Sequence, residues 1–209
     1  MERKVLFDLD GTLMTGDYHS IESKYFTELY GDKAYSFLDG LVKYLDQYEH
    51  RFKRYEIDVL SRFLTDKAGF LISEKDINGW IECTAEIDNV LEDGIIDVLE
   101  YFQSQRYTLG VLTNWVKRTQ EKRLINMGIR DYFSELYTGD IVLKPHLETY
   151  YVAIGKYPKE KCVIIGDNSE KDYGVPMSIG INSYLYDKKD KYPEITKNKV
   201  KKLNEIIRL

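Results

Sequence analysis

Short apolar runs alternate with amphipathic stretches over much of the chain. Each run is continuous and rich in apolar or β-branched side chains, and the runs cover residues 5–7, 107–112, 162–165 and 182–186, with a weaker one at 136–138. Such runs, when they alternate with helical patterns, are typical of parallel strands buried on both faces. Ile95, Leu99 and Phe102 share one face of such a helix, and Gly128 is placed to end another. The pattern predicts a three-layer α/β core, in which a parallel sheet is covered by helices on both faces.

Residues 14–91 have a different pattern, with helical spacing and no strand-like run. The i, i+3, i+4, i+7 rule holds for Ala34, Phe37, Leu38, Leu41, Val42, Leu45 and Tyr48. Further helices are expected at 20–30 and 55–68, and Ser73 with Asp76 has the spacing of a capping box that opens a fourth helix. We therefore predict a discontinuous core domain, residues 1–13 and 92–209, and an inserted all-helical domain, residues 14–91.

Charge and cysteine content narrow the class of protein. The 209 residues carry 30 Lys and Arg against 35 Asp and Glu, a net charge of -5, which disfavours nucleic acid as the main partner because phosphate backbones select basic surfaces. Cys83 and Cys162 lie far apart and outside any metal-binding spacing, so we expect a reducing, cytoplasmic setting. The first residues lack the apolar stretch of a signal peptide, and no run approaches the about 18 apolar residues of a membrane span, so no membrane partner is expected.

Acidic residues follow the first and the third of the strong runs. Asp8 and Asp10 come directly after the first one, and residues two apart in an extended segment project to the same side. Asp167 and Asp172 follow the run at 162–165. Because open α/β sheets bind ligands beyond the carboxyl ends of their strands, these acids are expected to face one point. Paired carboxylates there either hold a hard cation such as Mg2+ or divide nucleophilic and acid/base roles.

Three further polar residues stand at the same kind of position. Thr113 and Asn114 close the run at 107–112, and Lys144 precedes Pro145 at the expected start of a helix. Each has an ordinary explanation when taken alone: a helix cap for the first pair, and a surface lysine before a Pro-started helix for Lys144. Their shared location at strand ends and helix starts is what points to a single site.

Together these segments resemble the four motifs of the haloacid dehalogenase-like (HAD) hydrolase superfamily. In chain order they are Asp8-Leu9-Asp10-Gly11-Thr12, Leu112-Thr113-Asn114, Lys144-Pro145 and Gly166-Asp167 with Asp172. The resemblance implies a Rossmann-like core, and it implies that the helical segment between the first two motifs is a cap of the C1 type.

The resemblance also implies a role for each motif residue. Asp8 would be the nucleophile that forms an aspartyl-phosphate, and Asp10 would be the general acid and base. Thr113, Asn114 and Lys144 would hold the phosphoryl group. Mg2+ would be bound by the side chains of Asp8 and Asp167 and by the backbone carbonyl of Asp10, while Asp172 would orient Lys144 or a metal-bound water from outside the ligand set.

The acid at Asp10 favours phosphoryl chemistry, because in this superfamily the true dehalogenases lack it and a departing halide needs no proton. The expected protein is a Mg2+-dependent phosphatase acting on a small phosphorylated metabolite. A phosphotransferase or phosphomutase on a sugar phosphate remains an alternative, as does a non-catalytic phosphoryl-binding regulatory module. The sequence gives no expectation for the oligomeric state.

Substrate choice is expected to reside in residues 14–91. Tyr18, His19 and Lys24, together with the basic run Arg51, Lys53 and Arg54, are candidates either for contact with an anionic or sugar-like leaving group or for solvated surface. Trp80 is interpreted as cap core. Trp115, which follows Asn114, is a candidate either for the wall of the pocket or for packing.

Overall fold

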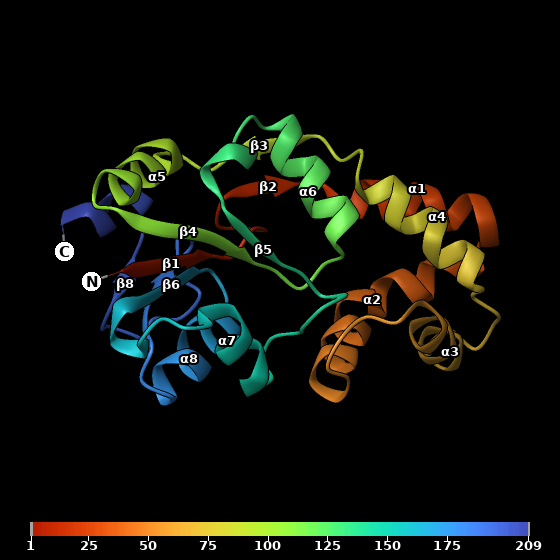
Figure 1. Ribbon diagram of the computed structural model, residues 1–209. Helices are drawn as coiled ribbons and strands as arrows, with labels where there is room; N and C mark the ends of the chain where they lie inside the picture. The colour runs from red at the N-terminus through yellow and green to blue at the C-terminus, as the bar shows by residue number, and fades with distance from the viewer. Residues whose placement is uncertain (1, 209) are drawn as a thin grey trace.

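A six-stranded, all-parallel sheet forms the centre of the computed structural model, which describes residues 2–208. The strand order is β5 (Glu135–Tyr137), β4 (Tyr107–Leu112), β1 (Arg3–Phe7), β6 (Cys162–Gly166), β7 (Asn182–Tyr186) and β8 (Lys199–Val200). The first strand of the chain is thus central, paired with β4 from Arg3↔Tyr107 to Phe7↔Val111 and with β6 on its other side. The predicted α/β class is confirmed, and all five predicted strands are present (Figure 1).

Side chains alternate between the two faces of this sheet, which gives two cores. Val5 and Phe7 pack with the buried face of α5 (Ile95–Ser104), whereas Leu6 packs with Tyr150 and Ala153 of α7 (Leu147–Ile154). In Figure 1, α5 and α6 (Lys117–Asn126) cover one face, and α7 and α8 (Val175–Ser178) cover the other. The short turns η1 (Arg130–Tyr132), η2 (Lys159–Lys161), η3 (Ser169–Gly174) and η4 (Leu203–Arg208) complete the layers. The core is therefore three-layered, as predicted.

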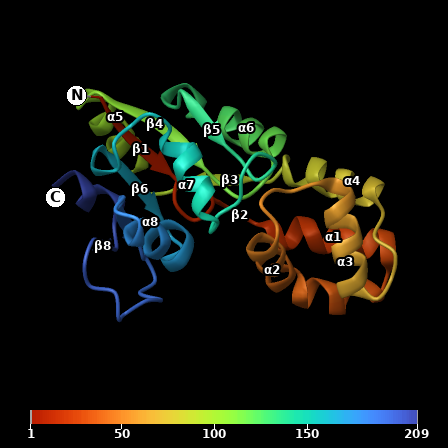
Figure 2. The same ribbon diagram turned by 60° about the horizontal axis from the view of Figure 1, so that its bottom comes forward.

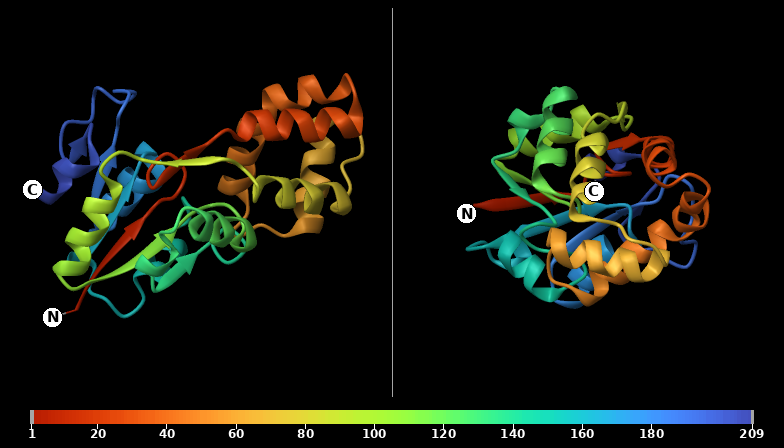
Figure 3. Two further views of the ribbon diagram at one scale, coloured as in Figure 1. Left: turned by 90° about the horizontal axis from the view of Figure 1, so that it is seen from above. Right: turned by 90° about the vertical axis from the view of Figure 1, so that its right-hand side faces the viewer.

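Four helices occupy most of residues 14–91, which we call the cap segment: α1 (Tyr18–Tyr30), α2 (Lys33–Arg51), α3 (Ile57–Ala68) and α4 (Glu74–Thr84). Their apolar faces meet in a separate cluster that includes Phe26, Phe37, Leu64 and Trp80. The predicted capping box is present, because Ser73 and Asp76 each bond the backbone N–H of the other. Figures 2 and 3 show this group of helices beside the carboxyl ends of the parallel strands.

The chain enters and leaves the four helices through a short ribbon. Strands β2 (Met14–Gly16) and β3 (Asn89–Leu91) pair antiparallel, with Met14 opposite Leu91 and Gly16 opposite Asn89. The expectation of an entirely helical segment was wrong here. Strands of three residues are too short to display a period, and they pair only because the two linkers run side by side. Among residues 2–208, no helix is both long and apolar enough to cross a lipid bilayer.

Candidate active site

The loop after β1 turns sharply at the edge of the sheet and places Asp8 there. The backbone N–H of Asp8 donates to the carbonyl of Ile165 at 2.8 Å, so the ladder to β6 continues through it. Gly11 has a φ of 80°, and a Cβ at this position would lie 2.7 Å from Oδ2 of Asp167. Only glycine fits both demands without strain. The first motif therefore needs its glycine for the approach of Asp167.

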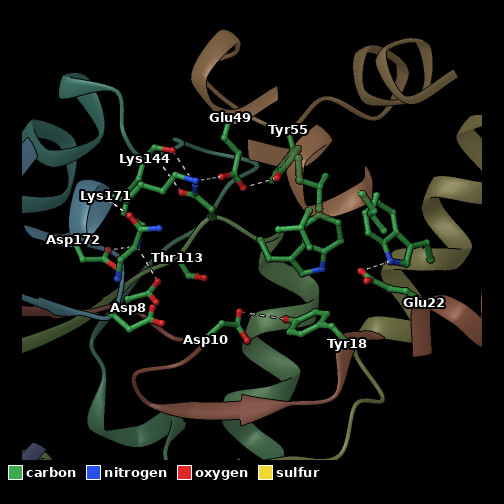
Figure 4. Close-up of a pocket in the computed structure, with 18 residues that line it drawn as sticks. Asp8, Asp10, Tyr18, Glu22, Glu49, Tyr55, Thr113, Lys144, Lys171 and Asp172 are labelled. Atoms are coloured by element: carbon green, nitrogen blue, oxygen red, sulfur yellow. Dashed lines mark hydrogen bonds and ion pairs between the residues drawn. The ribbon is translucent and has the colours of Figure 1, made fainter. Parts of the chain in front are cut away.

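A buried lysine joins two of the predicted acids. Lys144 Nζ donates to Asp8 Oδ1 at 2.8 Å and to Asp172 Oδ1 at 2.5 Å (Figure 4). Burial acts to lower the pKa of Lys144, but the carboxylates of Asp172 and Asp8 outweigh it and hold the pKa above its ordinary value. Burial raises the pKa of the Asp8 carboxyl, and the Lys144 ammonium opposes that rise. Lys144 therefore stays charged beside Asp8.

Three acids face one point at this end of the sheet. One oxygen from each of Asp8, Asp167 and Asp172 lies within 4.8 Å of the other two. Burial, and after it the negative charge of Asp172, raises the pKa of Asp167 to about 6. A set of buried carboxylate oxygens without enough counter-charge is the chemistry that fits a hard divalent cation.

Asp172 was expected outside the ligand set, and its carboxylate bonds other groups of the protein. Although its carboxylate lies within the acid cluster, Oδ1 accepts from Lys144 and Oδ2 accepts from the backbone N–H of Asn168 at 3.1 Å. Both oxygens are thus engaged by the protein. Gly166 lets this carboxylate come close to β6, since a Cβ there would lie 2.3 Å from the carboxyl carbon of Asp172.

Asp10 is held from several sides while its side chain remains 37% exposed. Tyr18 donates its hydroxyl to Oδ2 at 3.2 Å, and Gln120 donates from Nε2 to the same oxygen at 3.1 Å. Arg123 lies 2.7 Å from Oδ1 as an ion pair, although the two groups are not aligned as a hydrogen bond. Gln120 also donates to Thr113 Oγ1 at 2.9 Å and so connects the first motif to the second.

Sequence reasoning missed Gln120 and Arg123. Both are fully buried on α6, and Arg123 has no exposed side-chain surface. Their spacing of three puts them on one helix face, but α6 is polar almost throughout, so the hydrophobic pattern does not separate its buried face from its exposed one. Their residue types alone also suit a solvated helix.

Thr113 and Asn114 differ in whether their side-chain polar atoms are free to bind a substrate. The hydroxyl of Thr113, which is 2% exposed, lines a cavity together with Asp8 and Lys144. The side chain of Asn114 instead bonds both backbone groups of Lys144: its Nδ2 donates to the carbonyl, and its Oδ1 accepts from the N–H, each at 2.8 Å. Asn114 therefore fixes the loop that carries Lys144, a connection that its position in the sequence did not reveal.

A cavity of about 340 Å³ extends from these residues into the cap segment. Of the candidates in the cap segment, Tyr18 lines it, whereas His19 and Lys24 are exposed elsewhere. The basic run also lies outside it: Lys53 pairs with Glu148, and Arg54 pairs with Glu56. Trp115 fulfils both interpretations, since it lines the cavity and its Nε1 donates to Thr84 Oγ1 at 3.0 Å.

Comparison with known proteins agrees with this fold. The family model of haloacid dehalogenase-like hydrolases matches residues 3–174. The chain therefore belongs to this family of hydrolases, which confirms the resemblance read from the four motifs.

Individual relatives are more distant. The protein named as a HAD-hydrolase, YfnB, from Bacillus subtilis (strain 168) is 25% identical over 223 residues, which cover 98% of this chain and 93% of YfnB. Glyceraldehyde 3-phosphate phosphatase of Methanocaldococcus jannaschii is 26% identical over 124 residues, 54% of each chain.

Solved structures extend the likeness of the fold. A structure of YfnB described as bound to magnesium superposes with a TM-score of 0.74 at 21% identity, covering 100% of this chain and 98% of that one. L-2-haloacid dehalogenase from Xanthobacter autotrophicus gives a TM-score of 0.72 at 15% identity, with the same coverage. Because relatives include both a phosphatase and a dehalogenase, the residues of the site have to decide the reaction.

Proposed function

We propose that this protein is a Mg2+-dependent phosphatase that hydrolyses a small-molecule phosphomonoester through an aspartyl-phosphate on Asp8. The observation that carries the proposal is the second acid, Asp10, which faces the cavity beside Asp8 and is held there by Tyr18, Gln120 and Arg123. An acid in this place is needed to protonate a departing alkoxide but not a departing halide. The likeness to a phosphatase among the relatives agrees with this choice.

The proposed reaction has two steps. In the first, an Asp8 carboxylate oxygen attacks phosphorus, the bond from phosphorus to the ester oxygen breaks, and Asp10 gives its proton to that oxygen as the alcohol leaves. In the second, Asp10 takes a proton from a water molecule that attacks the aspartyl-phosphate. The bond from phosphorus to the Asp8 oxygen then breaks, which releases inorganic phosphate and restores both acids.

The remaining residues of the site stabilise and position the charges. Lys144, whose Nζ lies 2.8 Å from Asp8 Oδ1, offsets negative charge on the nucleophile and on the phosphoryl oxygens. The Thr113 hydroxyl can donate to a phosphoryl oxygen from its buried position at the end of β4. Asp172 acts on the reaction through Lys144, because it fixes the ammonium group from the other side.

The acid cluster suits Mg2+, which prefers oxygen ligands. Asp8, Asp167 and the backbone carbonyl of Asp10 would hold the ion. When bound, Mg2+ offsets the repulsion between the Asp8 carboxylate and the anionic phosphoryl group. The related YfnB structure described as bound to magnesium supports this assignment.

The proposal is tested by measuring phosphate released from p-nitrophenyl phosphate with Mg2+ present and after chelation. We expect activity that needs Mg2+ and that falls by at least about a thousandfold in Asp8→Asn, because the variant cannot form the covalent intermediate. Asp58→Asn, which alters an exposed acid paired with Arg62, is the matched control and should keep full activity.

The outcomes separate the alternatives. Near-normal activity of Asp8→Asn contradicts the proposal. A phosphotransferase would release less free phosphate than nitrophenol when an acceptor alcohol is present, and a non-catalytic binding module would release neither product.

A further inference from the structure

The cavity continues beyond the acids into the cap segment, where its walls change character. There it is lined by apolar and aromatic side chains: Leu41, Val42, Leu45, Tyr55, Trp80 and Trp115. The Trp115 ring packs against Tyr55 and Trp80, with centroids 5.3 Å and 4.8 Å away. The cavity volume of about 340 Å³ lies within the range of sites for small organic molecules. This half of the cavity suits a leaving group with an apolar or aromatic body.

The cations around the cavity are already paired. Among the described residues that line it, they are Lys144 and Lys171. Two carboxylates hold Lys144, and Lys171 Nζ lies 2.6 Å from Asp46 and 2.7 Å from Glu49. A second anionic group on the substrate would thus find both lysines of the cavity already paired with carboxylates.

Glu22 is an ionisable group in this half of the cavity that has no cation beside it among residues 2–208. It lies on α1 one turn after Tyr18, and its carboxylate lines the cavity at the end away from Asp8 (Figure 4). Trp80 Nε1 donates to it at 3.2 Å, and within residues 2–208 it has no ion-pair partner. Burial raises the pKa of Glu22 to about 7, against the opposing effect of the Trp80 bond. A cationic donor beside this carboxylate would repay the cost of burying it.

We propose that the leaving group of the substrate carries an amine, which binds the Glu22 carboxylate, on an apolar or aromatic body that packs against Trp80 and Trp115. This inference rests on the proposed phosphatase activity and makes Glu22 a specificity-determining residue. The aromatic rings add to the binding, since they attract an ammonium group through cation–π interaction. Phosphomonoesters with a second acidic group are disfavoured because Glu22 repels them, and polyols because the apolar walls leave their hydroxyls without partners.

Binding is measured first, in the Asp8→Asn background that blocks the proposed turnover, with Mg2+ present. The chain has two tryptophans, and both line the cavity, so quenching of their fluorescence reports occupancy. The probes are 4-(aminomethyl)phenyl phosphate and 4-(hydroxymethyl)phenyl phosphate, which differ in the amine alone. We expect the amine to bind at least about tenfold more tightly.

Glu22→Gln in the same background keeps the size of the side chain and an acceptor for Trp80, but removes the charge. It should abolish the preference for the amine. Glu28→Gln changes an exposed glutamate of the same helix and should leave the preference intact. Equal Kd values for the two probes, or a preference that survives Glu22→Gln, overturn the proposal.

A second pair of probes separates the amine from the ring. Phosphoethanolamine and 2-hydroxyethyl phosphate lack an aromatic body. Both should therefore bind more weakly than the aryl pair, while the preference for the amine is kept. If the aliphatic probes bind as tightly as the aryl probes, the role of the tryptophans is overturned.

Turnover of p-nitrophenyl phosphate by the unaltered protein is measured as a separate test of the phosphatase function. Its absence contradicts the phosphatase function, whereas turnover without an amine preference overturns only this inference.

Discussion

Asp167 shows how a single side chain of the site costs stability. Its pKa of about 6 is raised first by burial and then by Asp172, whereas an aspartate in an unfolded chain titrates near about 4. The folded protein without metal therefore binds this proton more tightly than the unfolded chain does. The contribution to stability is complete below about pH 4 and is lost as the pH rises through about 6.

Asp167→Asn should remove this part of the pH dependence. In the presence of a chelator, we expect the variant to melt within about a degree of the parent at low pH and a few degrees above it at about pH 7.5. Thermal unfolding followed by circular dichroism over that pH range measures the difference. Parallel curves for parent and variant would contradict the account. Mg2+ should raise the Tm of the parent at about pH 7.5 and have little effect on the variant, because the variant lacks one of the proposed ligands.

Arg123 links three elements to Asp10. From α6 its guanidinium reaches Asp10 at 2.7 Å, donates to the side chain of Asn89 on β3 at 2.6 Å, and donates to the hydroxyl of Tyr18 at the start of α1. Asn89 and Tyr18 stand at the two linkers of the cap segment. The position of Asp10, the proposed general acid, is thus tied to the ribbon that connects the cap segment to the core.

Arg123→Met should show that this residue positions Asp10. We expect kcat for an alkyl phosphate to fall at least about tenfold, because the alkoxide needs a proton from a well-placed acid. p-Nitrophenyl phosphate, whose leaving group needs little protonation, should be affected far less. Arg130→Met, which breaks an ion pair with Glu121 away from the site, is the control. An equal loss with both substrates would indicate a structural role instead.

The cap segment rests on the core along one side of the cavity. Two backbone bonds cross between them, from Tyr55 N–H to the carbonyl of Gly139 at 2.6 Å and from Leu143 N–H to the carbonyl of Lys53 at 2.9 Å. Lys171, next to Asp172, reaches across to Glu49 and Asp46 on α2. An ion pair beside the site therefore joins the cap segment to the core.

Lys171→Met should favour a more open molecule, since it leaves Glu49 buried without a counter-ion. We expect a larger radius of gyration by small-angle X-ray scattering and a KM raised several-fold. Lys53→Met is the matched control, because it removes an ion pair with Glu148 in which both side chains are largely exposed. Exposed pairs of this kind contribute about 0–1 kcal/mol to stability. Superimposable scattering curves together with an unchanged KM would contradict the prediction.

The hydrophobic pattern predicted most of the fold because helical spacing and continuous strand-like runs can both be recognised within a short stretch of sequence. The helices of the cap segment and the strands β1, β4, β6 and β7 lie where their spacing placed them. Strands β2, β3 and β8 were missed, since two or three residues cannot display a period of two. Those strands depend on neighbours that are distant in the sequence.

The candidate site was predictable where the motif residues follow strands, because parallel strands bring their carboxyl ends to one edge. The residues around them were not. The sequence alone does not distinguish a buried arginine such as Arg123 from a solvated one. For the basic run at 51–54 it left two interpretations open, and the structure supports solvated surface, because the run lies outside the cavity. Glu22 was likewise indistinguishable from the other acids of α1 until the helix was placed against Trp80.

The central position of β1 has a consequence for the order in which the chain can fold. Its two sheet partners begin at Tyr107 and Cys162, so during synthesis the first strand has no neighbour until about half of the protein exists. The four helices of the cap segment are made in that interval, and their contacts with one another are close in sequence, which favours early formation. The part that covers the cavity is thus available to fold before the sheet that carries Asp8, and the nascent first strand stays unpaired until the sheet closes around it.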